Sequence, residues 1–171
     1  MEVVAGVTRF QGEVLGVGYP WSGGEPVNDF YPTGAIQRVN AFTPRTSDFA
    51  YISIGTNDII NGAGATSVRN NLEIMIDQWI ARGVPANRLI VTTLPPLGSG
   101  GNTGIQALNT MIRTLAQGKG VRLVDLAAFT SANGLTWTNS SLHVGDFIHY
   151  SEAVRDWIAD QVVSIMFQLN P

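Results

Sequence analysis

The stretch DFAYISIGTNDIINGAG (Asp48–Gly64) predicts a buried strand and raises the first question about function. Its apolar run Phe49–Ile54 is bounded by turn signals, as expected for a strand covered on both faces of a sheet. The run ends abruptly in the residues GTND (55–58). An asparagine after a strand can be an ordinary turn residue, or its amide can donate a hydrogen bond to a developing oxyanion. Position alone favours the turn, so the role of Asn57 depends on the rest of the chain.

The composition provides ample material for one hydrophobic core. The 171 residues fit one domain of ordinary size, and 44% of them are hydrophobic while only 13% are charged. The formal net charge is −3 and no Lys/Arg cluster suited to phosphate occurs, which argues against nucleic-acid binding. Because the chain has no cysteine, disulfides and thiolate metal sites are excluded.

No targeting or membrane-spanning segment is expected in this sequence. No apolar run approaches the roughly 20 residues that a membrane helix needs. Residues Met1–Gly12 have neither a basic region nor a long apolar region, so they do not form a signal peptide. Abundant Gly, Asn, Thr and Ser with few Lys suits an extracellular or virion protein.

Strand-like apolar runs alternate with segments of helical periodicity along the chain. The expected strands are Glu13–Gly18, Phe49–Ile54, Arg88–Leu94 and Val121–Leu126, and the expected helices lie within Ala35–Phe42, Ser67–Arg82, Ile105–Leu115 and Val154–Met166. Such alternation predicts parallel strands joined by right-handed crossovers. We therefore expect a single domain over residues 1–171 with an α/β fold, a three-layer α/β/α sandwich around a doubly wound, flavodoxin-like parallel sheet.

The ends of the expected helices carry capping signals. Gly83 stands where a C-cap glycine should end the helix within Ser67–Arg82. Gly118-Lys119-Gly120 closes the next helix, and Ser151 can N-cap the last one.

In sheets of this kind, ligands bind outside the carboxyl ends of the strands. The residues that follow the expected strands therefore carry the most weight for function. They are Gly16 and Gly18, the GTND residues 55–58, Pro95-Pro96 and Asp125.

Asp146 and His149 are the best candidates for an acid–base pair. They are three residues apart, just before the last helix, and one turn of backbone can bring the carboxylate against the imidazole. The aspartate would fix the tautomer of a histidine that acts as general base. His143 is the other histidine of the chain, but no acidic residue stands three or four positions before it.

A metal site and a phosphate site are the alternatives to acid–base chemistry. Asp58, Asp125, Asp146, His143 and His149 could in principle supply metal ligands, but no H-E-x-x-H or paired-His spacing occurs. The glycine-rich GVGYPWSGG segment matches neither phosphate-binding loop pattern. We therefore expect no metal and no cofactor.

Three segments together resemble blocks of the SGNH/GDSL hydrolase family. They are ISIGTNDI (52–59), GDFIHYSEAV (145–154) and, more loosely, VLGVGYPWSGG (14–24). The resemblance runs from about Glu13 to the C-terminus, and the layout is similar to that of phage and bacterial SGNH domains. It implies a triad that contains Asp146 and His149. It also implies an oxyanion hole formed by Asn57 and the backbone N–H of Gly16, with Gly18 as the second choice.

The family's first block, Gly-Asp-Ser with the nucleophilic serine, has no counterpart in this sequence. The favoured explanation is a fragment whose first strand and serine are lost or supplied by another polypeptide, so that a partner chain or a swapped segment fills the gap. Alternatively, Glu2–Thr8 occupies the central strand with Thr8 in the place of the serine. A third possibility is that Ser22 was recruited. The nucleophile therefore stays unassigned.

The resemblance implies an acyl-ester hydrolase, either an esterase or a carbohydrate O-deacetylase, acting on a small-molecule or glycan ester. The main alternative is a catalytically inactive module on the same scaffold that binds glycans through Tyr19, Trp21 and Trp137. These aromatic side chains can equally be packing residues. A flavodoxin-like binder of a small ligand is a third hypothesis.

Overall fold

The computed structural model describes Val39, residues 43–98 and residues 102–169 of the chain. Its sheet has three parallel strands in the order β1 (Ala50–Ile52), β2 (Leu89–Thr92) and β3 (Arg122–Val124). The expected strand Glu13–Gly18 lies outside the described residues. So does the expected helix Ala35–Phe42, except for the buried Val39.

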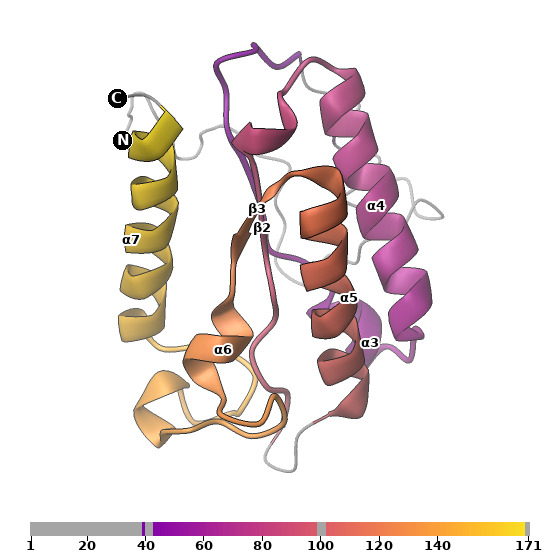
Figure 1. Ribbon diagram of the computed structural model, residues 1–171. Coiled ribbons are helices and arrows are strands. Elements are labelled where there is room, and N and C mark those ends of the chain that lie inside the picture. Colours follow the sequence, from indigo (N-terminus) through magenta and orange to yellow (C-terminus); the bar gives the residue numbers. More distant parts are fainter. Residues whose placement is uncertain (1–38, 40–42, 99–101, 170–171) are drawn as a thin grey trace.

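Helices cover both faces of this sheet. The crossover helices α4 (Ala65–Ala81) and α5 (Thr103–Lys119) pack side by side on one face, and α7 (Glu152–Leu169) lies on the other (Figure 1). The shorter elements are α3 (Thr56–Ile60), η1 (Ala86–Arg88), α6 (Leu126–Thr130) and η2 (Ser140–Leu142). This arrangement is the predicted three-layer α/β/α sandwich. None of the described helices is long and apolar enough to cross a membrane.

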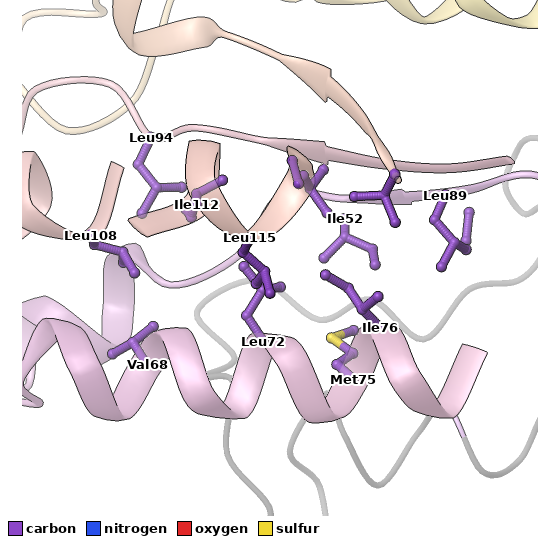
Figure 2. Packing of buried hydrophobic residues seen from close by; sticks show 14 of the residues in the cluster. Ile52, Val68, Leu72, Met75, Ile76, Leu89, Leu94, Leu108, Ile112 and Leu115 are labelled. Carbon is purple, nitrogen blue, oxygen red and sulfur yellow. The ribbon is translucent and has the colours of Figure 1, made fainter. Parts of the chain in front are cut away.

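The main core lies between the sheet and the pair α4 and α5. Helical spacing places Val68, Leu72 and Ile76 of α4 on one face, and Leu108 and Ile112 of α5 meet them beneath the strands (Figure 2). A smaller cluster of Leu126, Val154 and Ile158 attaches α7 to the other face. Burying these apolar side chains is what fixes the layers relative to the sheet.

The helix ends largely follow the capping signals. Gly83, with φ 99°, follows the C-cap residue of α4, and Gly120, with φ 71°, ends α5 in the left-handed conformation. The prediction for Ser151 was wrong in one respect. It directly precedes α7, but its Oγ is buried and makes no hydrogen bond within the described residues.

The third strand is shorter than the expected run Val121–Leu126. Asp125 ends it because its side chain accepts a hydrogen bond from the backbone N–H of Ala128 and so caps α6. Leu126 is consequently the first residue of that helix. A local cap thus overrides the apolar pattern of the sequence.

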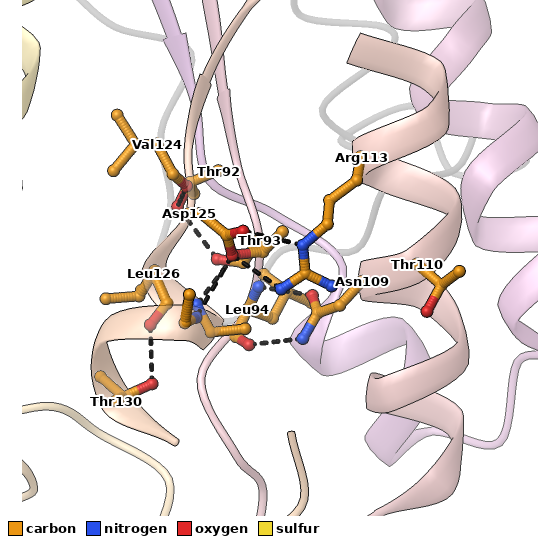
Figure 3. A network of polar contacts seen from close by, with 12 residues as sticks. Thr92, Thr93, Leu94, Asn109, Thr110, Arg113, Val124, Asp125, Leu126 and Thr130 are labelled. Carbon is orange, nitrogen blue, oxygen red and sulfur yellow. Dashed lines mark hydrogen bonds and ion pairs between the residues drawn. The ribbon is translucent and has the colours of Figure 1, made fainter. Parts of the chain in front are cut away.

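The carboxyl ends of β2 and β3 are joined by a polar network that is buried at Asn109 and partly exposed at Arg113 and Asp125 (Figure 3). The Asn109 amide of α5 accepts the backbone N–H of Leu94 and donates to its carbonyl oxygen, both at 2.7 Å. Asp125 forms a two-point ion pair with Arg113, with both N–O distances 2.8 Å, and accepts the Thr93 hydroxyl. These contacts satisfy backbone groups that the sheet leaves unpaired where its strands end.

The chain turns away from β1 at Gly55, which has φ 123°. A Cβ atom at this position would lie 3.2 Å from Val68, 3.3 Å from Leu108 and 3.4 Å from Leu94, whose side chains meet in Figure 2. Both the positive φ and the close approach therefore require glycine. This turn starts α3 and so places Asn57 at the carboxyl end of the sheet.

Gly55→Ala should lower the free energy of unfolding by roughly 2–5 kcal/mol, because it adds backbone strain and overpacking. The matched control is Gly118→Ala in α5, where φ is not positive and a Cβ would meet nothing within 4 Å. That change should stabilise the protein by about 0.5–1 kcal/mol. Urea unfolding of both variants measures the difference, and equal stabilities would contradict the close packing at residue 55.

Candidate active site

A loop at the carboxyl end of the sheet, residues 143–150, carries both predicted acid–base residues. It is closed like a hairpin, since His143 and Tyr150 form an antiparallel bridge and Val144 donates its N–H to the His149 carbonyl at 3.0 Å. The loop is also tied to the segment that follows β2, because Gly98 donates its N–H to the Phe147 carbonyl at 2.8 Å. The residues between β2 and α5 therefore help to hold this loop in place.

The structure brings Asp146 and His149 into direct contact. His149 Nδ1 lies 2.6 Å from Asp146 Oδ2, while Asp146 Oδ1 accepts the backbone N–H groups of Ile148 and His149, both at 2.9 Å. When the carboxylate accepts a hydrogen bond from Nδ1–H, Nε2 of the neutral ring has no proton and can take one. The His149 side chain is 76% exposed, so a substrate can reach Nε2 from solvent.

The surroundings of Asp146 favour its ionised form. The His149 imidazole has the largest effect, and with the two backbone N–H groups it holds the pKa of the Asp146 carboxyl well below its usual range. The carboxylate therefore stays charged over the whole pH range in which an ester hydrolase would operate. It can stabilise an imidazolium when His149 accepts a proton.

Asn57 lies at the same end of the sheet as this loop. It is the second residue of α3, and both α3 and the segment from α6 to α7 are at the lower end of Figure 1, where the strands finish. The side chain is partly exposed, and its amide has no hydrogen-bond partner within the described residues. The neighbouring Asp58 is buried instead. The Asn57 amide is thus able to donate a hydrogen bond to a ligand.

Several of the other predicted site residues lie outside the part of the chain that the structure describes. Gly16, Gly18, Ser22 and Thr8 lie outside the described residues, as do the aromatic residues Tyr19 and Trp21. Within the described part of the chain, no three His, Asp or Glu side chains are grouped so that they could hold a metal ion. Trp137 packs its ring against His143, with centroids 5.2 Å apart.

Asp125 was considered as a metal ligand in the sequence, but its carboxylate has structural partners. Burial opposes its ionisation, yet the Arg113 guanidinium and the Thr93 hydroxyl hold the pKa of Asp125 below its usual value.

A groove of about 420 Å³ lies beside the ion pair of Arg113 and Asp125, between α5 and the segment after α6. None of Asn57, Asp146 and His149 lines this groove, so it is separate from the candidate active site.

Two features were not predicted from the sequence: the pair of hydrogen bonds between the Asn109 amide and the Leu94 backbone, and the burial of His143. Asn109 has a signal in the sequence, because it is a polar residue four positions after Ile105 on the apolar face of its helix. His143 has none, since its burial depends on aromatic side chains elsewhere in the segment between α6 and α7.

Comparison with protein families decides the assignment. The model of the GDSL-like lipase/acylhydrolase family matches residues 12–156, which is most of the chain. The chain belongs to this family. The membership confirms the resemblance to SGNH/GDSL hydrolases and the prediction that the protein is an ester hydrolase.

Solved structures show the same fold. A GDSL-like lipase from Bacteroides thetaiotaomicron has a TM-score of 0.69 at 15% identity, with 85% of this chain and 73% of that chain covered. A member of the lipolytic G-D-S-L family from Veillonella parvula has a TM-score of 0.62 at 18% identity, with 77% of this chain and 72% of that chain covered. An aryl esterase from M. smegmatis has a TM-score of 0.58 at 20% identity, covering 83% and 75%. A search among curated protein sequences found no match.

The ionisation of Asp146 can be measured by following its carboxyl carbon with NMR as the pH is lowered. The midpoint should lie well below the ordinary value of about 3.9, and His149→Ala should move it back towards that value. Because folding lowers this pKa, the contribution of Asp146 to stability is present above the ordinary value and is lost as the pH falls below it. A midpoint at or above the ordinary value in the parent protein would contradict the contact with His149.

Proposed function

We propose that this domain hydrolyses carboxylic esters by a Ser-His-Asp mechanism in which His149 is the general base and Asp146 orients it. Asn57 and the backbone N–H of Gly16 would form the oxyanion hole. The observation that carries the proposal is the 2.6 Å contact between His149 Nδ1 and Asp146 Oδ2. It leaves an exposed Nε2 at the end of the sheet where ligands bind in folds of this class.

The reaction runs through an acyl-enzyme. A hydroxyl oxygen attacks the ester carbonyl carbon as its proton passes to His149 Nε2, and the negative carbonyl oxygen accepts hydrogen bonds from the Asn57 amide and the Gly16 N–H. The intermediate collapses, and the alcohol leaves with the proton from His149. Water then attacks the acyl group by the same route and releases the acid. No cofactor takes part.

The exposure of the pair supports an ester that protrudes from a larger molecule. With three-quarters of the His149 side chain exposed and 42% of that of Asp146, the pair lies at the surface of the described residues and not in a deep pocket among them. An O-acetyl group on a carbohydrate can reach such a surface, and so can a small aryl ester. We therefore propose esterase activity on short acyl groups, with carbohydrate O-acetyl esters as the substrate class.

His149→Ala should lower kcat for an aryl acetate by roughly 10²–10⁴-fold, because the general base is lost. Asn57→Ala should lower it by about 10²–10³-fold, because one oxyanion donor is lost. The matched control is Asn61→Ala, which removes an exposed amide at the other end of α3 and should leave kcat unchanged. Full activity in both site variants would exclude the mechanism. Glycan binding by a parent protein without turnover would favour the non-catalytic module.

An alkyl fluorophosphonate should identify the nucleophile. The activated hydroxyl oxygen forms a bond to phosphorus and fluoride leaves, so peptide mass spectrometry locates the modified residue. We expect one labelled hydroxyl, either Ser22, Thr8 or a residue of a second polypeptide, and much slower labelling in His149→Ala. Equal labelling rates in the two proteins would show that His149 does not activate the nucleophile.

A further inference from the structure

We propose that His143 is a positioning residue for the reaction. By accepting the backbone N–H of Gly145 at Nδ1, it fixes the turn that presents Asp146 to His149. This role rests on the proposed function of the Asp146–His149 pair, but it concerns a residue whose side chain hydrogen-bonds to Gly145 and not to either member of that pair. On this proposal, His149 is the general base and His143 positions the loop that carries it.

The two histidines have opposite environments. His143 is 8% exposed, whereas the His149 side chain is largely in solvent. The buried ring packs near two aromatic side chains, with centroid distances of 5.2 Å to Trp137 and 4.4 Å to Phe147. A histidine enclosed in this way is poorly placed to exchange protons with a substrate, so its role must be sought in the loop itself.

One hydrogen bond connects the His143 ring to the backbone that precedes Asp146. The N–H of Gly145 donates to His143 Nδ1 at 3.0 Å. The acceptor nitrogen carries no proton in this contact, so the proton of the neutral ring is on Nε2. Gly145 has φ 102°, a conformation that only glycine adopts readily. The contact therefore fixes the backbone of Gly145, an intrinsically flexible residue that directly precedes Asp146.

The residue after Asp146 is held in an unfavourable conformation. Phe147 has φ 60°, which is rare for a bulky side chain. Its ring packs on His143, and its carbonyl oxygen accepts the N–H of Gly98. This backbone geometry directs the N–H groups of Ile148 and His149 at Asp146 Oδ1. His143 thus contacts the residues on both sides of Asp146, one through its Nδ1 atom and the other through its ring.

These contacts explain how a buried ring can control an exposed pair. Asp146 and His149 are both solvent-accessible, so burial alone does not hold them in one geometry. Their alignment depends on the loop backbone, and catalytic geometry is sensitive to displacements on the order of 1 Å. Loss of the Nδ1 acceptor should therefore reduce kcat and leave KM unchanged, because substrate binding does not involve His143.

Two substitutions of His143 distinguish the effect of its hydrogen-bond acceptor from the effect of its ring packing. His143→Phe keeps an aromatic ring against Trp137 and Phe147 but has no acceptor, whereas His143→Asn loses the ring and places its Oδ1 near the position of Nδ1. Ser141→Ala, an exposed position in η2, is the matched control. Without substrate, NMR measures the exchange of the Ile148 and His149 amide protons and the Nδ1 proton shared with Asp146. With an aryl acetate, kcat and KM are measured separately.

The Phe variant should exchange both amide protons at least about tenfold faster than the parent, by local opening of the loop. Its kcat should fall by roughly 10- to 100-fold at constant KM. The Asn variant should recover most of the protection and activity, and the control should match the parent. Parent-like exchange in the Phe variant, or an Asn variant as loose as the Phe variant, would overturn the proposal.

The design distinguishes this proposal from the proposed function. If the parent hydrolyses no ester but the Phe variant still loses amide protection, this chain alone lacks ester-hydrolase activity while the positioning role is supported. If the Phe variant does not fold, nitrogen-15 NMR of the parent decides. A proton on Nε2 of the neutral His143 ring is expected, and a proton on Nδ1 would overturn the proposal.

Discussion

The carboxyl end of β1 can approach its neighbours only because residue 55 has no side chain. Side chains of Val68 in α4, Leu108 in α5 and Leu94 after β2 converge on Gly55, where they leave less than ordinary packing distance for a Cβ atom. The positive φ of the glycine then turns the chain into α3. The position of Asn57 at the edge of the sheet follows from this single close approach, so the core and the candidate site share one constraint.

Polar contacts at the same edge connect the buried core to the exposed loop. Asn109 fixes both backbone groups of Leu94, and a few residues later Gly98 donates its N–H to Phe147 of the loop. The buried contacts thus support a surface pair, Asp146 and His149, that has little packing of its own. Such a division suits a hydrolase, because the acid–base residues need solvent access and a fixed geometry at once.

The parts of the fold with strong local signals could be predicted from the sequence. Alternating apolar runs predicted the parallel sheet and its crossover helices, and the D-x-x-H spacing predicted the contact between Asp146 and His149. The buried His143 and the ion pair of Arg113 with Asp125 depend on residues brought together by the tertiary fold, so no local pattern could reveal them. The extent of β3 was overestimated because a helix cap competes with an apolar run.

The proposed mechanism requires Asn57, Asp146 and His149 to act on one reacting group. A crystal structure of the protein after covalent phosphonylation tests it most directly, because the phosphonyl group mimics the tetrahedral intermediate. A phosphonyl oxygen is expected within hydrogen-bond distance, about 3 Å, of the Asn57 amide, and His149 Nε2 is expected to face the modified hydroxyl oxygen. An adduct bound away from both side chains would contradict it.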